Sequence, residues 1–311
     1  MSFAFIFPGQ GSQSVGMLSE LAQHHPVVTE VFAEASNVLG YDLWNLVQEG
    51  PAEELNQTDR TQPAMLTAGV ACWRVWQQQG GAAPSVMAGH SLGEYTALVC
   101  SDAMTLSDAV GLVADRGRFM QQAVAAGEGA MAAVLGLDDD AVRSVCSDAA
   151  DGDVLSAVNF NSPGQVVIAG NAAAVERATV LAKERGAKRA IVLPVSVPSH
   201  CSLMAPAAEK LQERLSDINI ATPSIAVINN VDVEAPTDAG QIKQALVKQL
   251  SNPVRWVETI NHMFAGGASS AIECGPGKVL AGLNKRINKE FQAYPLFDDA
   301  SLAKALEAIN K

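Results

Sequence analysis

Short apolar runs alternate with stretches of helical spacing along the first part of the chain. Residues 2–7 form an apolar run that ends at Pro8, and a second run covers residues 85–88. Between them, apolar residues recur at helical spacing from Val27 to Leu39. Strands that alternate with helices are typical of a parallel sheet covered by helices on both faces. The pattern therefore predicts an α/β fold with a mostly parallel sheet.

The middle of the chain follows a different order. The pattern there predicts a strand at 130–135, a helix at 138–150, strands at 154–159 and 165–169, a helix at 171–185 and a strand at 190–193. This β-α-β-β-α-β order is that of a ferredoxin-like unit. The alternation then resumes with helices at 202–215, 239–250 and 254–264 and a strand at 271–274. We therefore predict an inserted subdomain at 127–196, within a core made of 1–126 and 197–311.

Charge limits the partners of the chain. Its 311 residues include 21 Lys and Arg against 33 Asp and Glu, for a formal net charge of −12. A strongly acidic protein is a poor candidate for wrapping a polyanion, so we expect no nucleic-acid partner. Hydrophobic residues make up 48% of the chain and charged residues 17%, which is an ordinary globular balance.

Apolar segments and cysteines indicate a cytoplasmic protein. The opening run has no basic segment before it and is too short for a signal peptide. The longest other apolar stretch, 64–73, ends at Arg74, well short of the roughly 18 residues that span a bilayer. The five cysteines are odd in number and include no C-x-x-C pair. We therefore expect reduced thiols, no metal site, no membrane partner and a cytoplasmic location.

The strongest chemical signal is Gly89-His90-Ser91-Leu92-Gly93, a G-x-S-x-G sequence between a predicted strand and a helical stretch. A nucleophilic serine needs a tight strand-to-helix turn that lifts its hydroxyl above the sheet, and small residues on either side let the backbones pass closely. The next amide, that of Leu92, then points from a helix N-terminus toward an oxyanion. This context favours Ser91 as a nucleophile over the alternative of a tight helix start.

A serine nucleophile needs a base, and the chain offers five histidines. His24 and His25 precede a proline in a polar stretch, which is typical of surface residues. His90 adjoins the serine, but its side chain is expected to point away from it, and His262 lies on a helical pattern. His200 is left as the candidate base, a choice that the residues alone do not decide.

An acid that would orient the histidine is not recognisable. Asp102, Asp108 and Asp115 lie between the serine and the histidine, but none sits in a distinctive setting. A backbone carbonyl could orient the imidazole instead and would leave no trace in the sequence. Arg116 and Arg118 lie in an apolar helical stretch where a guanidinium is unusual unless it reaches a pocket, and each could also be a surface charge.

A series of motifs follows in order along essentially the whole chain. They are Phe7-Pro8-Gly9-Gln10-Gly11-Ser12-Gln13, Thr61-Gln62-Pro63-Ala64, Gly89-His90-Ser91-Leu92-Gly93-Glu94-Tyr95, Asn159-Phe160-Asn161-Ser162-Pro163-Gly164-Gln165, Pro198-Ser199-His200, Asn229-Asn230-Val231-Asp232, Gln249-Leu250-Ser251-Asn252-Pro253-Val254 and Gly275-Pro276-Gly277. In this set the chain resembles the malonyl-CoA:acyl carrier protein transacylases of bacterial fatty acid synthesis. The G-H-S-x-G motif alone is only moderately specific, whereas the ordered set is highly specific.

The resemblance implies a hydrolase-like core with a ferredoxin-like insert and gives roles to residues of these motifs. Ser91 matches the acylated nucleophile and His200 its base. Gln249 matches the residue whose backbone carbonyl orients that histidine, which would explain the missing acid. The backbone amides of Gln10 and Leu92 match the oxyanion hole.

The resemblance also implies a substrate pocket. Arg116 matches the arginine that binds the malonyl carboxylate, and Asn159, Asn161 and Asn229 fall in pocket-side motifs as substrate-binding candidates. Cys274 departs from the family pattern, in which a larger apolar residue is common before Gly-Pro-Gly. This departure touches none of the implied roles.

The implied reaction moves a malonyl group from malonyl-CoA to the phosphopantetheine thiol of acyl carrier protein through a malonyl-serine. Coenzyme A and the carrier's phosphopantetheine are then substrates, and no cofactor or metal is expected. A serine thioesterase or esterase would share the same nucleophile and base. A nucleotide-binding module is suggested by Gly9-Gln10-Gly11, but Ser14 stands where the last glycine of G-x-G-x-x-G belongs. A noncatalytic carrier-binding scaffold is the remaining alternative.

An acidic carrier protein would need local positive charge on this acidic chain. Two clusters offer it, the first made of Lys183, Arg185, Lys188 and Arg189 and the second of Lys285 and Arg286. Either cluster is a candidate docking surface, although the residues of the first, taken alone, favour an ordinary solvated helix end.

Overall fold

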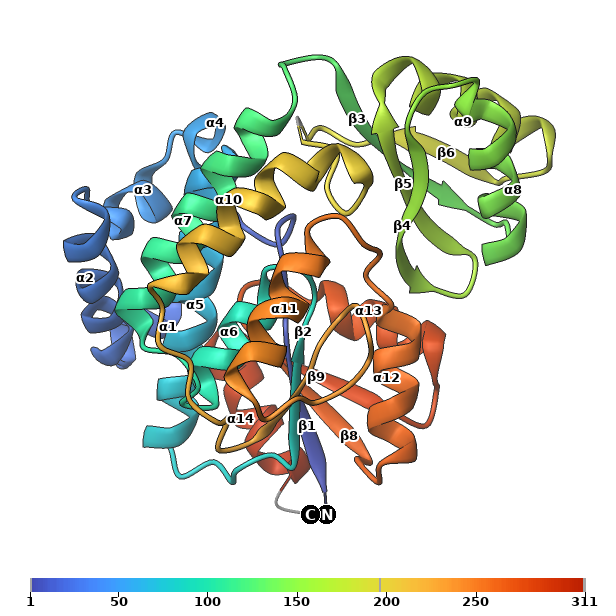
Figure 1. Ribbon diagram of the computed structural model, residues 1–311. Coiled ribbons are helices and arrows are strands. Elements are labelled where there is room, and N and C mark those ends of the chain that lie inside the picture. The colour runs from blue at the N-terminus through green and yellow to red at the C-terminus, as the bar shows by residue number, and fades with distance from the viewer. Residues whose placement is uncertain (1, 196, 310–311) are drawn as a thin grey trace.

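The computed structural model describes residues 2–195 and 197–309, and its larger part is built on a five-stranded sheet (Figure 1). The strand order is β7-β2-β1-β8-β9, and every neighbouring pair is parallel. The strands are β1 (Phe3–Phe7), β2 (Val86–Gly89), β7 (Ala226–Ile228), β8 (Ser270–Cys274) and β9 (Gln292–Leu296). This arrangement confirms the predicted α/β fold with its mostly parallel sheet.

The central strand β1 shows why both faces of the sheet are covered. Its residues alternate in direction, so Phe3, Phe5 and Phe7 enter one hydrophobic cluster while Ala4 and Ile6 enter another. The phenylalanine face packs against α5 (Thr58–Gln78), where Phe5 contacts Trp73 and Trp76, and against α6 (Gly93–Cys100). The same hydrophobic cluster extends to α2 (Val27–Leu39) and α7 (Leu106–Ala123). The other face packs against α12 (Trp256–Ala265) and α13 (Val279–Ile287). An uninterrupted apolar strand is what such double burial requires.

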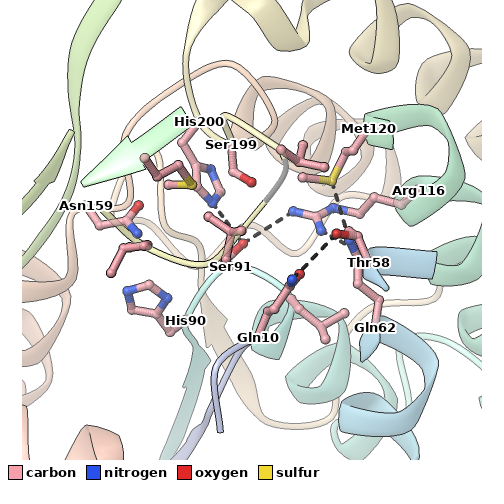
Figure 2. Close-up of a pocket in the computed structure, with 15 residues that line it drawn as sticks. Gln10, Thr58, Gln62, His90, Ser91, Arg116, Met120, Asn159, Ser199 and His200 are labelled. Carbon is pink, nitrogen blue, oxygen red and sulfur yellow. Dashed lines mark hydrogen bonds between the residues drawn. The ribbon is translucent and has the colours of Figure 1, made fainter. Parts of the chain in front are cut away.

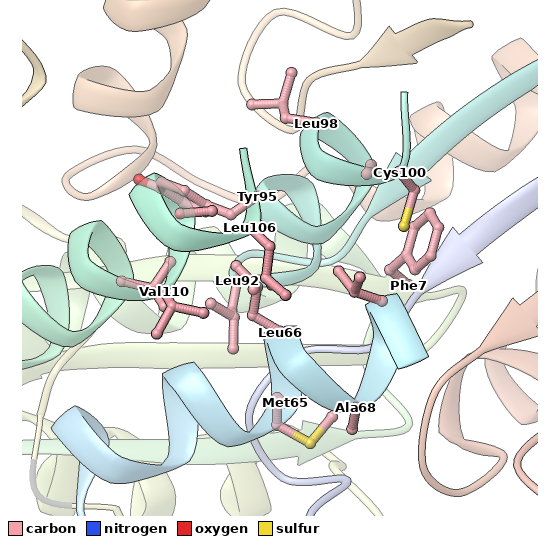
Figure 3. Packing of buried hydrophobic residues seen from close by; sticks show 14 of the residues in the cluster. Phe7, Met65, Leu66, Ala68, Leu92, Tyr95, Leu98, Cys100, Leu106 and Val110 are labelled. Carbon is pink, nitrogen blue, oxygen red and sulfur yellow. The ribbon is translucent and has the colours of Figure 1, made fainter. Parts of the chain in front are cut away.

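Apolar packing also fixes the start of α6, the helix that follows Ser91. Leu92 is 1% exposed and lies among Leu66 of α5 and Leu106 and Val110 of α7 (Figure 3). Burying a side chain of this size contributes about 1.5–3 kcal/mol. The turn that carries the serine is therefore anchored by the core directly beneath it.

The smaller part of the fold is an antiparallel sheet with two helices on one face (Figure 1). Its elements are β3 (Gly129–Leu135), α8 (Asp139–Ala150), β4 (Leu155–Ser162), β5 (Gln165–Asn171), α9 (Ala172–Glu184) and β6 (Arg189–Val192), and the sheet order is β4-β5-β3-β6. The β-α-β-β-α-β order is confirmed. The boundaries of the insert at 127 and 196 stay a prediction, and residue 196, like residues 1, 310 and 311, lies outside the described residues.

Hydrogen bonds tie the small sheet to the large body. The Phe160 amide of β4 donates to the Val254 carbonyl at 3.0 Å, and the Val254 amide donates to the Val158 carbonyl at 2.8 Å. A strand of the insert thus pairs with the segment just before α12. The insert is held against the core at the level of the serine turn, where β4 also supplies Asn159.

The remaining elements complete the cover of the large sheet. They are α1 (Ser19–His24), α3 (Leu43–Glu49), α4 (Ala52–Leu55), η1 (Ser202–Met204), α10 (Ala205–Ser216), α11 (Ala239–Gln249) and α14 (Asp299–Ile309). The predicted helix at 202–215 begins as the 3₁₀ turn η1 before the α-helix starts at Ala205. The apolar stretch 64–73 lies inside α5, which continues past Arg74. Within the described ranges, no helix is both long and apolar enough to cross a membrane.

Candidate active site

The candidate site lies where the parallel strands end. Gln10 follows β1, Ser91 follows β2, and Asn229 and Asn230 follow β7. Because parallel strands place their carboxyl ends at one edge of a sheet, loops from distant parts of the sequence meet there. This edge is the usual ligand-binding edge of open α/β sheets.

Ser91 occupies a strained turn that only small neighbours permit. Its φ is 52°, in the left-handed region that few residues other than glycine adopt. A Cβ on Gly89 would lie 1.8 Å from the carbonyl carbon of Gly93, and one on Gly93 would lie 2.1 Å from the Phe7 carbonyl oxygen. Both glycines are therefore required by close backbone contacts, as the G-x-S-x-G spacing predicts.

His200 lies in hydrogen-bond contact with Ser91. The serine Oγ is 2.9 Å from Nε2 of the imidazole (Figure 2). Nδ1 of the same ring is 2.7 Å from the backbone carbonyl oxygen of Gln249. A carbonyl can only accept, so Nδ1 carries the ring proton and Nε2 is free to accept from the serine. The structure thus brings together the three residues that the sequence proposes as nucleophile, base and orienting carbonyl.

The acids that lie between Ser91 and His200 in sequence are engaged elsewhere. Asp102 accepts from Ser224, Asp108 accepts from Thr105 at the start of α7, and Asp115 pairs with Arg118 and Arg214. None of them contacts the histidine. The imidazole of His200 is therefore oriented by a backbone carbonyl, that of Gln249, and not by a carboxylate.

Electrostatics keep His200 neutral. The side chain is 3% exposed, and burial, followed by the positive charge of Arg116, lowers the pKa of His200 to about 3. Both causes disfavour the imidazolium. The ring is therefore a proton acceptor over the whole range of neutral and mildly acidic pH.

We expect the His200 ring to stay unprotonated between pH 5 and 8, whereas an ordinary histidine titrates near 6.5. The measurement is a pH titration of the histidine Cε1–Hε1 resonances by NMR, with the resonance assigned by its loss in His200→Ala. Arg116→Ala should raise the His200 pKa, because it removes the second cause of the shift. A His200 resonance that titrates near 6.5 in the unmodified protein would contradict this result.

Arg116 reaches the serine from α7, and Arg118 does not. The Arg116 side chain is 1% exposed, with its Nη2 3.3 Å from Ser91 Oγ and its Nη1 2.8 Å from Gln62 Oε1. Arg118 is 56% exposed and pairs with Asp115 on the surface. Of the two arginines that the sequence leaves open, Arg116 is therefore the one that reaches the cavity. Gln62, to which the sequence assigns no role, is a hydrogen-bond partner of its guanidinium.

A cavity of about 120 Å³ opens beside these groups. Gln10 and Leu92 of the large body line this cavity, and Asn159 lines it from the insert (Figure 2). Met131 and Leu193 of the insert line it as well. The backbone amides of Gln10 and Leu92 donate to no other group within residues 2–195 and 197–309. The buried Oδ1 of Asn159 likewise has no hydrogen-bond partner there. These donors and this acceptor are available to a bound molecule.

The other two asparagine candidates do not line this cavity. Asn161 Oδ1 is 2.8 Å from His90 Nε2, so it joins the insert to the serine turn. Asn229 Oδ1 accepts from the amides of Val231 and Asp232, which closes the turn after β7. The structure therefore brings Asn159, but neither Asn161 nor Asn229, to the cavity wall.

Two residues without a predicted role contact the serine turn. Asn230 Oδ1 accepts from the Ser91 amide at 2.6 Å, and its Nδ2 donates to the Gly89 carbonyl at 2.6 Å. Glu94 accepts from the Asn230 amide at 2.9 Å. Their presence in two of the ordered motifs was the only sequence signal for them.

Comparison with known proteins places the chain in a family. The acyl transferase domain family matches residues 4–300. A malonyl CoA-acyl carrier protein transacylase from Salmonella typhimurium is 59% identical over 304 residues, which cover 98% of each chain. The chain belongs to the malonyl CoA-acyl carrier protein transacylases. The family resemblance seen in the motifs is thereby confirmed.

Solved transacylase structures share the whole fold. An acyl carrier protein S-malonyltransferase from Vibrio cholerae is 60% identical and superimposes with a TM-score of 0.96, covering 98% of this chain and all of that one. A malonyl-transacylase in complex with a type II PKS acyl-carrier protein is 56% identical, with a TM-score of 0.98 over 99% of this chain and all of that one. The hydrolase-like core and ferredoxin-like insert are thus those of the transacylases.

Proposed function

We propose that the protein transfers the malonyl group of malonyl-CoA to the phosphopantetheine thiol of acyl carrier protein, and so supplies fatty acid biosynthesis. The observation that carries this proposal is the buried Arg116 guanidinium, 3.3 Å from the Ser91 hydroxyl. A cation at this position suits an acyl group that ends in a carboxylate. The names of the relatives support the same substrate.

In the first half-reaction, Ser91 Oγ attacks the thioester carbonyl while His200 Nε2 takes its proton. The negative charge that develops on the carbonyl oxygen is stabilised by the free amides of Gln10 and Leu92. The tetrahedral intermediate then breaks its carbon–sulfur bond. His200 returns the proton to the leaving thiolate of coenzyme A, and the malonyl group remains as an ester on Ser91.

The second half-reaction runs in reverse with a new thiol. His200 deprotonates the phosphopantetheine thiol of the carrier, and the thiolate attacks the malonyl-serine carbonyl. The same amides stabilise the oxyanion, and His200 protonates Ser91 as the ester breaks. The carboxylate of the acyl group stays with Arg116, and Asn159 Oδ1 is placed to accept from an amide or hydroxyl of the incoming arm. Both thiol carriers are substrates, and the steps need no further cofactor.

A serine thioesterase is the competing function, since it would share the same nucleophile and base. Mass spectrometry after brief exposure to malonyl-CoA should show one malonyl adduct, and adding holo carrier protein should move that adduct to the carrier faster than water releases malonate. Rapid release of malonate with no malonyl carrier would favour the thioesterase. Absence of any adduct would favour a noncatalytic carrier-binding role.

We further propose that the protein works in the cytoplasm. All five cysteines are free and buried, which suits a reducing compartment. Burial also raises the pKa of Cys201 to about 11, so its thiol is a poor nucleophile despite its place beside His200.

One arginine of each candidate docking cluster lies at the same end of the small sheet. Arg286 of α13 donates to Gln165 at 2.7 Å, Gln165 is paired with Leu135 in the small sheet, and Leu135 is paired on its other side with Arg189. Leu135 lies four residues along β3 from Met131 in the cavity wall, about 13 Å at the usual strand rise. We propose this end of the insert as the docking surface for an acidic carrier.

Arg189→Glu and Arg286→Glu should each raise the carrier KM by about fivefold, the effect of roughly 1 kcal/mol of surface electrostatics. The malonyl-CoA KM should not change, and added salt should reduce the difference between variant and unmodified protein. Steady-state kinetics with varied carrier measure both constants. Lys304→Glu on the distant helix α14 is the matched control, and carrier kinetics equal to that control in both variants would place docking elsewhere.

A further inference from the structure

A buried chain of side chains runs behind the catalytic serine. Glu94 is 2% exposed and stands in the first turn of α6, and Gln249 is fully buried at the end of α11. The Gln249 amide nitrogen donates to Glu94 Oε2 at 2.8 Å, and its amide oxygen accepts from Arg116 Nη2 at 2.9 Å. Gln249 therefore joins Glu94 to Arg116 through its side chain, while its backbone carbonyl accepts from His200.

The polarity of this chain is fixed by its two ends. A guanidinium has no acceptor, so the Gln249 amide must present its oxygen to Arg116. Burial raises the pKa of Glu94 to about 7, so at pH 8 its carboxylate is ionised, has no donor, and must be faced by the amide nitrogen. The glutamine side chain can thus take only one orientation.

Arg116 is a buried cation with no carboxylate in direct contact. Within the described ranges its hydrogen bonds go to Gln62, Gln249 and the Ser91 hydroxyl, all of them neutral groups. A buried charge is costly unless an opposite charge lies nearby. Burial lowers the pKa of Arg116, and Tyr95 and then the charge of Glu94 oppose that lowering. Glu94 is the carboxylate among these groups, so it is the one placed to compensate the cation.

Resting on the proposed function, we propose that Glu94 is a positioning residue for malonyl selectivity. It acts through the Gln249 side chain to hold and charge-balance the Arg116 guanidinium, while the intervening amide keeps its carboxylate from occupying that guanidinium. Within the described ranges, no carboxylate of the protein thereby occupies the side of Arg116 that faces Ser91, where the carboxylate of the substrate would bind. Neither Glu94 nor the Gln249 side chain needs to touch the acyl group.

Two substitutions separate this role from general support of the site. Glu94→Gln can keep both accepted hydrogen bonds through its amide oxygen while it removes the charge. Gln249→Leu removes the connecting amide, and with it the 3.1 Å hydrogen bond from that amide to the Ser91 carbonyl, but keeps the backbone carbonyl that orients His200. Glu94→Gln leaves the bond to Ser91 in place. Each is made alone and together with Arg116→Ala, and malonyl and acetyl transfer from the CoA thioesters are measured at pH 8.

We expect each single variant to lower malonyl kcat/KM by roughly 10- to 100-fold, the worth of one charge-assisted hydrogen bond between Arg116 and the malonyl carboxylate. Acetyl transfer should change by less than about twofold, the usual error of additivity. In the Arg116→Ala background either substitution should also change malonyl kcat/KM by less than about twofold, because its effect passes through the missing arginine. Such non-additivity is the signature that a merely structural role would not produce.

Glu273→Gln is the matched control. Glu273 is a fully buried carboxylate that accepts from the Leu280 and Ala281 amides at the start of α13, away from Arg116. Its substitution should leave the malonyl-to-acetyl ratio unchanged even where it lowers the thermal midpoint.

Parallel losses for malonyl and acetyl groups, or losses that add to that of Arg116→Ala, would overturn the positioning role. Circular dichroism and thermal melts establish that each variant folds. If Glu94→Gln does not fold, Gln249→Leu decides the matter, since it leaves the bond between Glu94 and Asn230 in place. The unmodified protein in the same assay separates failure of the positioning role from failure of the proposed function. Absence of malonyl transfer by the unmodified protein would refute the proposed function itself.

Discussion

Ser91→Ala is expected to yield a folded protein that forms no malonyl adduct. The strained turn places one hydroxyl at the end of β2 in hydrogen-bond contact with His200, in a cavity that Gln10 and Leu92 also line. Water cannot take its place in a ping-pong reaction, because the acyl group must be held between two thiols. Intact-mass spectrometry after exposure to malonyl-CoA should show the adduct at one per chain in the unmodified protein and none in the variant.

Ser199 supplies a control for this experiment. It lines the same cavity and neighbours His200, but no contact with the imidazole nitrogens is formed by its hydroxyl in the described structure. Ser199→Ala should therefore retain the malonyl adduct. An adduct that persists in Ser91→Ala at full stoichiometry would place the nucleophile at another residue, and peptide mapping would locate it.

Arg116→Ala is expected to lower malonyl kcat/KM by about 10² to 10⁴, which corresponds to two charge-assisted hydrogen bonds of roughly 1.5–3 kcal/mol each. Acetyl transfer should hold steady or rise, because an acetyl group has no carboxylate and no longer meets an unpaired cation. Arg116→Lys should restore only part of the malonyl rate, since an ammonium cannot form the planar two-point contact. The measurement is malonyl and acetyl transfer side by side in all three proteins.

Arg118→Ala is the matched control for this loss, because its guanidinium points to solvent from the same helix. It should leave both acyl rates near those of the unmodified protein. Equal losses of malonyl and acetyl transfer in Arg116→Ala would instead mean that the arginine supports the geometry of Ser91 and His200.

Most of the fold could be predicted from local patterns in the sequence. The apolar run of β1 and the order of elements in the insert follow from periodicity alone, because each segment is long or sharply bounded. The edge strands β7 and β9 were not predicted. β7 has only three residues, and β9 contains Pro295, which an edge strand tolerates but which weakens the strand pattern.

The residues of the site likewise fall into those that a local motif reveals and those that only the packing of the fold reveals. Ser91 is visible in five consecutive residues, because the turn it needs is local. Arg116 and Arg118 look alike in sequence, yet two residues along a helix correspond to a rotation of about 200°, so only packing decides which one faces the serine. Glu94 and Asn230 could not be assigned, since they bond to each other and to atoms of elements distant in the chain.

The wall of the cavity and its chemistry come from different parts of the fold. Ser91, His200 and Arg116 belong to the large body, whereas Met131, Asn159 and Leu193 of the insert line the same cavity. A designer who wants another acyl group can therefore change the insert residues that line the cavity while keeping Ser91 and His200, and must also replace Arg116 where the new group carries no carboxylate. A chimaera with a transplanted insert must keep the two backbone hydrogen bonds at Val254. A transplanted β4 has to form them for its residues to line the cavity beside Ser91.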